Sequence, residues 1–126
     1  MPYAAITYRV KEGHEDEIAR VFAGFQRVES PVLHDEHGEA SGMLLGTAVF
    51  IKDNLMVRVI HYDGSMADVA RHMAGHPGVH VLEQALAPHL ADRRDTRAPG
   101  AFEEDFRNAT MRCISQLTLD THPTRR

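Results

Sequence analysis

The 126-residue chain has a single cysteine, Cys113, so no disulfide can form within it, as expected of a protein in a reducing cytoplasm. Tryptophan is absent, and aromatic residues make up only 6% of the chain. No apolar run approaches the length of a membrane span, and residues 1–3 lack the charged start of a signal peptide. We therefore expect a cytoplasmic protein without a membrane segment.

Positive charge is also scarce, because 14 basic residues stand against 18 acidic ones and the net charge is −4. A nucleic-acid-binding surface needs clustered cations that neutralise phosphates, so nucleic acid is not an expected partner. The sequence also has no Gly-rich dinucleotide fingerprint, no P-loop, no Cys/His zinc pattern and no nucleophile elbow. These absences favour a site that works without an organic cofactor or a bound metal.

Hydrophobic periodicity predicts alternating strands and helices. Strands are expected where polarity alternates or apolar residues run together, with a three-residue polar link making a hairpin of the middle two. Helices are expected where apolar residues recur at helical spacing behind acidic or capping residues. The predicted strands cover residues 3–10, 43–51, 55–62 and 110–119. The predicted helices cover residues 15–25, 66–73, 77–90 and 99–107, with an exposed polar connection over residues 29–42.

This order of elements is that of the ferredoxin-like βαββαβ arrangement, an α+β fold in which helices cover one face of a four-stranded antiparallel sheet. The length suits one domain over residues 1–126, with a core over residues 3–119 and a loose tail over residues 120–126. Both faces of the hairpin strands carry apolar side chains, yet the helices can cover only one. A second copy of the chain is the simplest cover for the other face, so we expect a homodimer with its sheets face to face.

Three histidines, His72, His76 and His80, lie where Gly75 and Pro77 interrupt two helical patterns. Histidine titrates near neutrality, so such a cluster suits proton transfer, anion binding or metal ligation. The interruption spoils the i, i+4 geometry that a metal site on one helix needs, so no metal is expected here. A role as general base or phenolate ligand, and a structural role in capping helix ends, both stay open.

Arg58 lies on the second hairpin strand, where alternation places it on one face with Ile60 and Tyr62 and places His61 on the other. An unpaired charge among large apolar residues is unfavourable. Arg58 therefore indicates either an ion pair at an interface or a pocket that binds an anionic ligand.

Arg112 presents the same problem on the predicted last strand, where it shares a face with Gln116. Two arginines on core strands suit a cavity that binds an enolate or a phenolate, with an ion pair in a dimer interface as the alternative. Cys113, next to Arg112 but on the opposite face, is interpreted as a small core residue.

Five separated segments resemble the SchA/CurD-like family, which is encoded in actinomycete gene clusters for aromatic polyketides, including spore pigments. The resemblance spans residues 3–119 and is carried by residues 5–15, 45–53, 56–60, 70–74 and 109–113. The order of elements is also similar to that of the dimeric α+β barrel superfamily, which contains small cofactor-free monooxygenases and polyketide cyclases. The resemblance implies a tailoring enzyme that acts on a polycyclic aromatic polyketide, with other tailoring enzymes as candidate partners.

The first functional hypothesis is a cofactor-independent monooxygenase of a polycyclic phenolic intermediate. One of His61, His72 and His76 would remove a proton, and Arg58 or Arg112 would stabilise the resulting anion. The remaining expected substrate contacts are His80, Tyr62 and Gln116.

Two other hypotheses are open. A cyclase or aromatase would use the same base and anion site for aldol ring closure, and a non-catalytic partner would bind another tailoring enzyme. We expect one pocket per protomer, between the hairpin strands and the corner from His72 to His80, with Gly46 leaving room in the facing strand.

Overall fold

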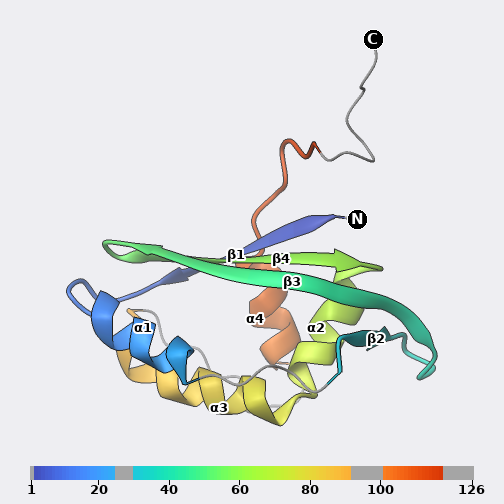
Figure 1. Cartoon of the computed structure of the whole chain (residues 1–126), viewed down its shortest axis with the longest axis horizontal. Coiled ribbons are helices and arrows are strands. Elements are labelled where there is room, and N and C mark those ends of the chain that lie inside the picture. The colour runs from blue at the N-terminus through green and yellow to red at the C-terminus, as the bar shows by residue number, and fades with distance from the viewer. Residues whose placement is uncertain (1, 25–29, 92–100, 118–126) are drawn as a thin grey trace.

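The computed structural model describes residues 2–24, 30–91 and 101–117. Four strands form one antiparallel sheet in the order β1-β4-β3-β2, and the helices lie together on one side of it (Figure 1). The strands are β1 (Tyr3–Arg9), β2 (Val32–His34), β3 (Ala40–Lys52) and β4 (Leu55–Asp63). The helices are α1 (Glu15–Ala23), α2 (Met66–Ala74), α3 (Pro77–Leu86), the 3₁₀ turn η1 (Ala87–His89) and α4 (Ala101–Ala109). This arrangement confirms the predicted α+β class.

The helix boundaries follow the local signals of the sequence. Acidic residues occupy the first turn of α1, where the helix dipole favours negative charge. The Ser65 hydroxyl accepts a hydrogen bond from the Asp68 N–H at 3.1 Å and so caps α2. Pro77 begins α3, in a position where its missing N–H leaves no bond unmade. The break between α2 and α3 is therefore built into residues 74–77, as predicted.

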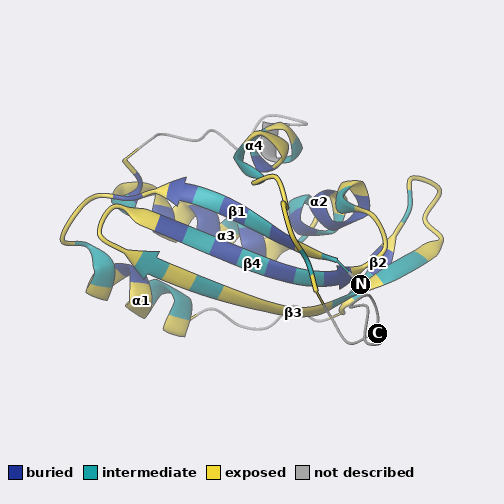
Figure 2. Cartoon of the chain, turned by 90° about the horizontal axis from the view of Figure 1, so that it is seen from above, coloured by how far each residue is buried: buried dark blue, intermediate teal, exposed yellow. Residues whose placement is uncertain are grey.

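The core lies between the sheet and the helices. Alternate residues of β1 and β4 point toward the helices, and we call this side of the sheet the covered face; Figure 2 shows the alternation as dark blue bands along both strands. The other side, which carries Tyr3, Phe50, Val59 and His61, is the open face. The covered face and the helices together bury a continuous cluster that includes Ile6, Ile18, Leu33, Met56, Ile60, Val69, Met73, Val79 and Leu82.

A β-bulge in β3 breaks the alternation of faces that a regular strand over residues 43–51 would have. Leu44 pairs with Tyr62 and Gly46 pairs with His61, so Leu45 is an extra residue between them. Strict alternation groups Leu44 with Phe50, but the bulge shifts the parity and leaves Leu44 packed against the core while Phe50 is 61% exposed. Gly46 then lies opposite His61 on the open face, so it cannot make room beneath the helices as expected.

The fourth strand is also not the one predicted. Val32–His34, inside the expected polar connection, forms β2, because Leu33 is fully buried in the core and pairs with Gly42. The expected last strand does not form in the described residues up to 117: Thr110 makes one isolated bridge to Ile6. Apolar residues recur there at every third position instead of alternating, which is not the pattern of a half-covered strand.

Residues 111–117 instead pass β1 to the side of the sheet that has no helices (Figure 1). The Met111 N–H donates to the Ala5 carbonyl at 2.8 Å, and Gln116 Oε1 accepts from the Tyr3 N–H at 2.9 Å. This segment leaves Ile114 and Leu117 largely exposed. Phe25, the charged loop after Ala91 and the tail from residue 120 lie outside the described residues. No helix among the described residues is long and apolar enough to cross a membrane.

Candidate functional site

The three histidines predicted as a cluster do meet at the α2–α3 corner, but two of them are held by backbone groups. His76 is the N-cap of α3, and its Nδ1 accepts a hydrogen bond from the Gly78 N–H at 3.1 Å. His80 Nε2 donates to the Ala74 carbonyl, one of the free acceptors at the end of α2. Both interactions tie the ends of neighbouring helices, so the capping interpretation accounts for His76 and His80.

His72 differs from these two neighbours. Its Nε2 is buried and has no hydrogen-bond partner in the described structure, and its ring centre lies 6.2 Å from that of His76. Burial, with smaller contributions from His76 and His34, lowers the pKa of His72 below its ordinary value. At neutral pH His72 is therefore an uncharged imidazole with an unused polar atom, which suits a proton acceptor or a hydrogen-bond partner for a ligand.

Arg58 is the second group with an unused buried atom. The side chain is 7% exposed, and its Nε has no hydrogen-bond partner among the described residues. Its cross-strand neighbours are Ile6 and Val49, and Met56 and Ile60 flank it on the covered face of β4. No carboxylate of the described residues lies within ion-pair distance of this guanidinium, although such a partner would normally compensate the burial of a charge. The charge would be stabilised by an anionic ligand.

Arg58 Nε and His72 Nε2 are the two buried side-chain nitrogen or oxygen atoms in the described part of the chain that lack a hydrogen-bond partner. Buried polar groups in folded proteins are nearly always paired, so each exception calls for a ligand or a role. Tyr62, on the same face as Arg58, is 7% exposed. Burial, with a smaller contribution from Cys113, raises the pKa of the Tyr62 phenol, which keeps it a hydrogen-bond donor at neutral pH.

Other predicted site residues lie on the open face of the sheet, away from Arg58, His72 and Tyr62. The ring of His61 stacks on Tyr3, with ring centres 4.2 Å apart and planes 8° apart. Gln116 accepts the Tyr3 backbone N–H on the same side. The sheet lies between His61 and Arg58, because alternate residues of β4 point to opposite faces. One ligand beneath the helices therefore does not contact both.

Arg112 and Cys113 are not on a core strand, because the described residues 110–117 form no strand beyond the isolated bridge at Thr110. Both side chains are exposed, which corrects the interpretation of Cys113 as a core residue. Arg112 likewise does not need a buried partner and does not form a pair of strand arginines with Arg58. Its place is at the border of a cavity between α2 and α4.

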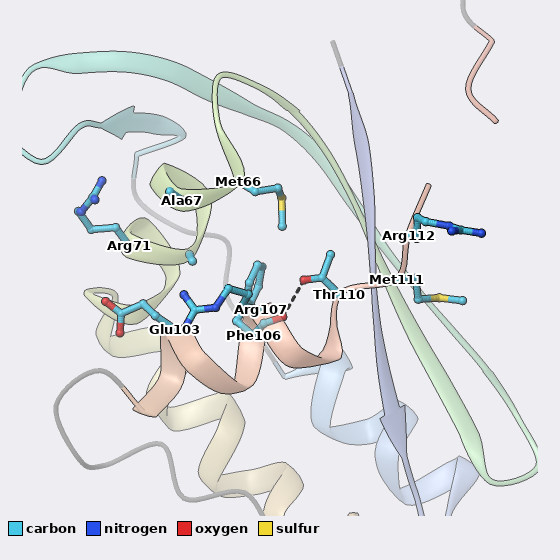
Figure 3. A pocket seen from close by; sticks show the side chains of 10 residues that line it. Met66, Ala67, Arg71, Glu103, Phe106, Arg107, Thr110, Met111 and Arg112 are labelled. Carbon is cyan, nitrogen blue, oxygen red and sulfur yellow. Dashed lines mark hydrogen bonds between the residues drawn. The ribbon is translucent and has the colours of Figure 1, made fainter. Parts of the chain in front are cut away.

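That cavity has a volume of about 600 Å³ and does not lie where the sequence placed the pocket. Met66 from α2 faces Phe106 of α4 and Thr110, the residue that follows α4, across it, and Arg107 extends from α4 beside them (Figure 3). Neither the α2–α3 corner histidines nor the hairpin strands line it. The complete lining is Met66, Ala67, Ala70, Arg71, Glu103, Phe106, Arg107, Thr110, Met111 and Arg112.

Asp68 anchors the α2 side of this region to the sheet. Its carboxylate accepts from the Ser41 hydroxyl at 2.7 Å and from Arg71 Nη1 at 2.6 Å, and Arg71 also donates to the His34 carbonyl at 3.3 Å. The hydrogen bond from Ser41, with a further contribution from Arg71, holds the pKa of Asp68 below its usual value despite burial. Arg71 is thus committed to a structural network.

Sequence reasoning missed one histidine pair. His14, before α1, and His89, in η1, bring their Nδ1 atoms to 2.9 Å, so one ring donates to the other. The residues are 75 positions apart, and no local pattern indicates the contact. Within the described residues, no group of three or more histidine, cysteine or acidic side chains comes close enough to hold a metal ion.

Comparison with known proteins places these features in a family. The family model of the SchA/CurD-like domain matches residues 1–119. A 42.8 kDa protein in the whiE locus of Streptomyces coelicolor is 33% identical over 114 residues, which cover 90% of this chain and 27% of that protein. Polyketide synthase CurD of Streptomyces cyaneus is 32% identical over 113 residues, covering 90% of this chain and 29% of that protein. The chain thus spans less than a third of these relatives.

Among solved structures, the tetracenomycin F2 cyclase of Streptomyces glaucescens, described as a type-II polyketide cyclase, has a similar fold. The TM-score is 0.59, and the match covers 94% of this chain and 98% of that chain at 13% sequence identity. At this identity the likeness concerns the fold alone, and it agrees with the predicted α+β class.

Proposed function

Because the chain belongs to the SchA/CurD-like domain family, we propose that it is a tailoring domain that acts on an aromatic polyketide intermediate. One relative and one protein of similar fold carry names that point to this chemistry, the polyketide synthase CurD and the type-II polyketide cyclase. The reaction we propose begins with removal of a proton from an enolisable or phenolic position of the substrate.

The observation that carries this proposal is the pair of unused buried nitrogens on Arg58 and His72. A neutral imidazole can accept a proton, and a buried guanidinium can stabilise the enolate or phenolate that results. Tyr62, held as a phenol, is a further donor on the face of Arg58. We assign the base to His72 rather than His76 or His80, because the latter two already bind backbone groups.

Aldol ring closure is the outcome we place first, because a base and an anion-stabilising donor are sufficient for it. The stabilised carbanion attacks a carbonyl carbon of the same polyketide molecule, and the carbonyl oxygen takes up a proton. The monooxygenase reaction that the sequence suggests begins with the same deprotonation but requires oxygen as a second reactant. The two proposals therefore share their first step and differ in oxygen consumption.

We further propose that the active form is a homodimer joined through the open face. Phe50 is 61% exposed there, and its cross-strand neighbour Val57 is only half-buried. An apolar sheet face of this kind is unusual on a monomer and suits a second copy of itself.

Proton exchange tests the shared first step without knowledge of the natural substrate. An anthrone-type phenol is incubated with the protein in D₂O under argon, and deuterium incorporation at its activated methylene is followed by NMR. We expect exchange well above the buffer rate, reduced at least tenfold in Arg58→Gln and in His72→Ala. The double variant should be no slower than the worse single variant if both groups act on one anion.

Oxygen then separates the two reactions. The same substrate under air is oxidised by a monooxygenase, whereas a cyclase leaves its oxidation level unchanged and instead closes rings in a reconstituted polyketide pathway. If the two single variants exchange protons as fast as the unchanged protein, the proposed site is wrong. A variant in which His61, His72 and His76 are all replaced by alanine gives a further test. If the reconstituted pathway keeps its full flux with this variant, the hypothesis of a non-catalytic partner protein is favoured.

A further inference from the structure

We propose that the cavity between α2 and α4 is a second binding site, specific for a planar aromatic monoanion such as an aryl carboxylate. Its volume of about 600 Å³ lies within the range of roughly 300–1,000 Å³ that small-molecule sites occupy. Neither Arg58 nor His72 lines it. The inference therefore stands independently of the proposed reaction.

The apolar part of the lining fits a flat ring system. Met66, Ala67 and Ala70 of α2 form one wall, and Phe106 of α4 forms the other (Figure 3). The alanines leave width between the helices, while the thioether of Met66 and the ring of Phe106 give favourable contacts to an aromatic ligand. Thr110 does not disturb this surface, because its hydroxyl already donates to the Phe106 carbonyl at 2.7 Å.

The charged part of the lining selects an anion. Three arginines, Arg71, Arg107 and Arg112, stand against one carboxylate, that of Glu103. Arg71 is engaged by Asp68 and the His34 carbonyl. Arg107 has no hydrogen-bond or ion-pair partner in the described parts of the chain, although Glu103 lies one turn before it on α4. Its guanidinium is thus available for the two parallel hydrogen bonds that a carboxylate accepts.

The position of Arg107 and Glu103 defines the ligand more closely. In Figure 3 the Arg107 side chain extends from α4 toward α2, beside Phe106, so one group meets the anion while the rings lie against the apolar walls. The Glu103 carboxylate repels a second negative charge at the same end of the cavity. A ligand with one carboxylate and a flat apolar body satisfies both conditions.

The experiment uses 2-naphthoate as the probe and its neutral amide, 2-naphthamide, as the matched ligand. Binding to the full chain is measured by titration calorimetry, and the site is located by amide chemical-shift changes in the NMR spectrum. We expect naphthoate to bind at least tenfold more tightly than naphthamide, with shift changes centred on α2 and α4.

Two variants and one control make the test specific. Arg107→Gln should weaken naphthoate at least tenfold and leave naphthamide unchanged, because only the charge-assisted contact is lost. Ala67→Trp should block both ligands, since Ala67 is an exposed helix position where a large side chain enters the cavity without overpacking the core. Arg20→Gln removes an exposed arginine from α1, away from the cavity, and should change neither affinity.

Equal affinity of naphthoate and naphthamide, or unchanged naphthoate binding in Arg107→Gln, would overturn the proposal. Shift changes centred elsewhere than α2 and α4 would overturn it as well. Arg107→Gln should retain the proton-exchange activity described above, because Arg107 is outside that site. Failure of this site and failure of the proposed reaction are thereby distinguishable.

Discussion

Arg58 and His61 lie on the same strand, β4, but the two faces of the sheet give them different surroundings. On the covered face Arg58 is 7% exposed among aliphatic side chains, and its Nε has no partner within the described structure. On the open face His61 is half-buried and stacks on Tyr3 at 4.2 Å between ring centres. The covered face thus holds an unpaired charge that a ligand would stabilise, and the open face holds side chains suited to association.

The largest expected effect is on the covered face and comes from Arg58→Met. This change removes the buried charge and keeps an apolar side chain of similar length, so the free energy of unfolding should rise by about 1–4 kcal/mol. Activity in the exchange assay should fall by about 10²–10³-fold, as when one anion-stabilising donor is removed. Thermal unfolding and exchange rates are the measurements. A variant that is less stable and fully active would mean that Arg58 is structural.

The corresponding change on the open face is Phe50→Asp. A carboxylate at this exposed, apolar position should prevent two sheets from packing together and convert the expected dimer into a monomer. Light scattering after size exclusion gives the mass directly. Arg20→Asp, a charge reversal at an exposed position of α1 on the side of the helices, is the control and should leave the dimer intact. A Phe50→Asp protein that keeps the mass of the dimer would exclude this face as the interface.

On the covered side, His76→Ala tests whether a corner histidine is structural. Loss of the N-cap should lower the free energy of unfolding by about 1 kcal/mol, whereas His76→Asn, with a side chain that can cap, should restore most of it. Both variants should keep their exchange activity, unlike His72→Ala. Thermal melting curves and proton-exchange rates of the variants are the measurements. A His76→Asn protein that is fully stable but inactive would identify His76, and not His72, as the base.

The pH dependence of stability should also trace to the covered side. The pKa of His72 is lowered in the folded state, so the unfolded chain binds a proton first, and stability should fall as pH drops below about 6.5. The lowered pKa of Asp68 adds a second loss at more acidic pH, when its carboxylate becomes protonated. Urea unfolding between pH 8 and 3 measures both steps. His72→Gln should remove only the loss of stability that begins below about pH 6.5. If this loss persists in the variant, it arises from another histidine.

The smallest effect is expected from His61→Ala on the open face. If the reaction takes place beneath the helices, exchange activity should change by less than about threefold, because the sheet separates His61 from Arg58. The loss of the stacked contact with Tyr3 should weaken stability only slightly. A loss comparable with that of Arg58→Met would place the reaction on the open face instead.

Much of the fold was predictable because its signals are local. The acidic first turn of α1, the Ser65 cap of α2 and the break before Pro77 each depend on residues close together in the chain. The parity of β4 likewise placed Arg58 among apolar residues and His61 on the opposite face, since side chains alternate along a strand whatever its partners. The family resemblance stated from separated segments agrees with the match over residues 1–119.

The errors have a common physical reason, which is that the deciding contacts are distant in the sequence. Two apolar residues, Val32 and Leu33, become a strand only because β3 lies beside them, and the extra residue Leu45 changes the faces only through its pairing with β4. The segment after Thr110 has no alternating pattern, so its course across the sheet depends on β1.

The sequence by itself therefore determined the class of fold, the first residues of α1, α2 and α3, the family and the position of an arginine that needs a partner. Only the tertiary structure decided which histidine keeps a ring nitrogen without a hydrogen-bond partner in the described residues. His76 and His80 are hydrogen-bonded to backbone groups of the α2–α3 corner, whereas His72 Nε2 is not. It also decided that α2 and α4 enclose a cavity beside Arg107. Hydrogen-bond satisfaction and enclosed volume arise from packing between elements, and neither is written in local sequence patterns.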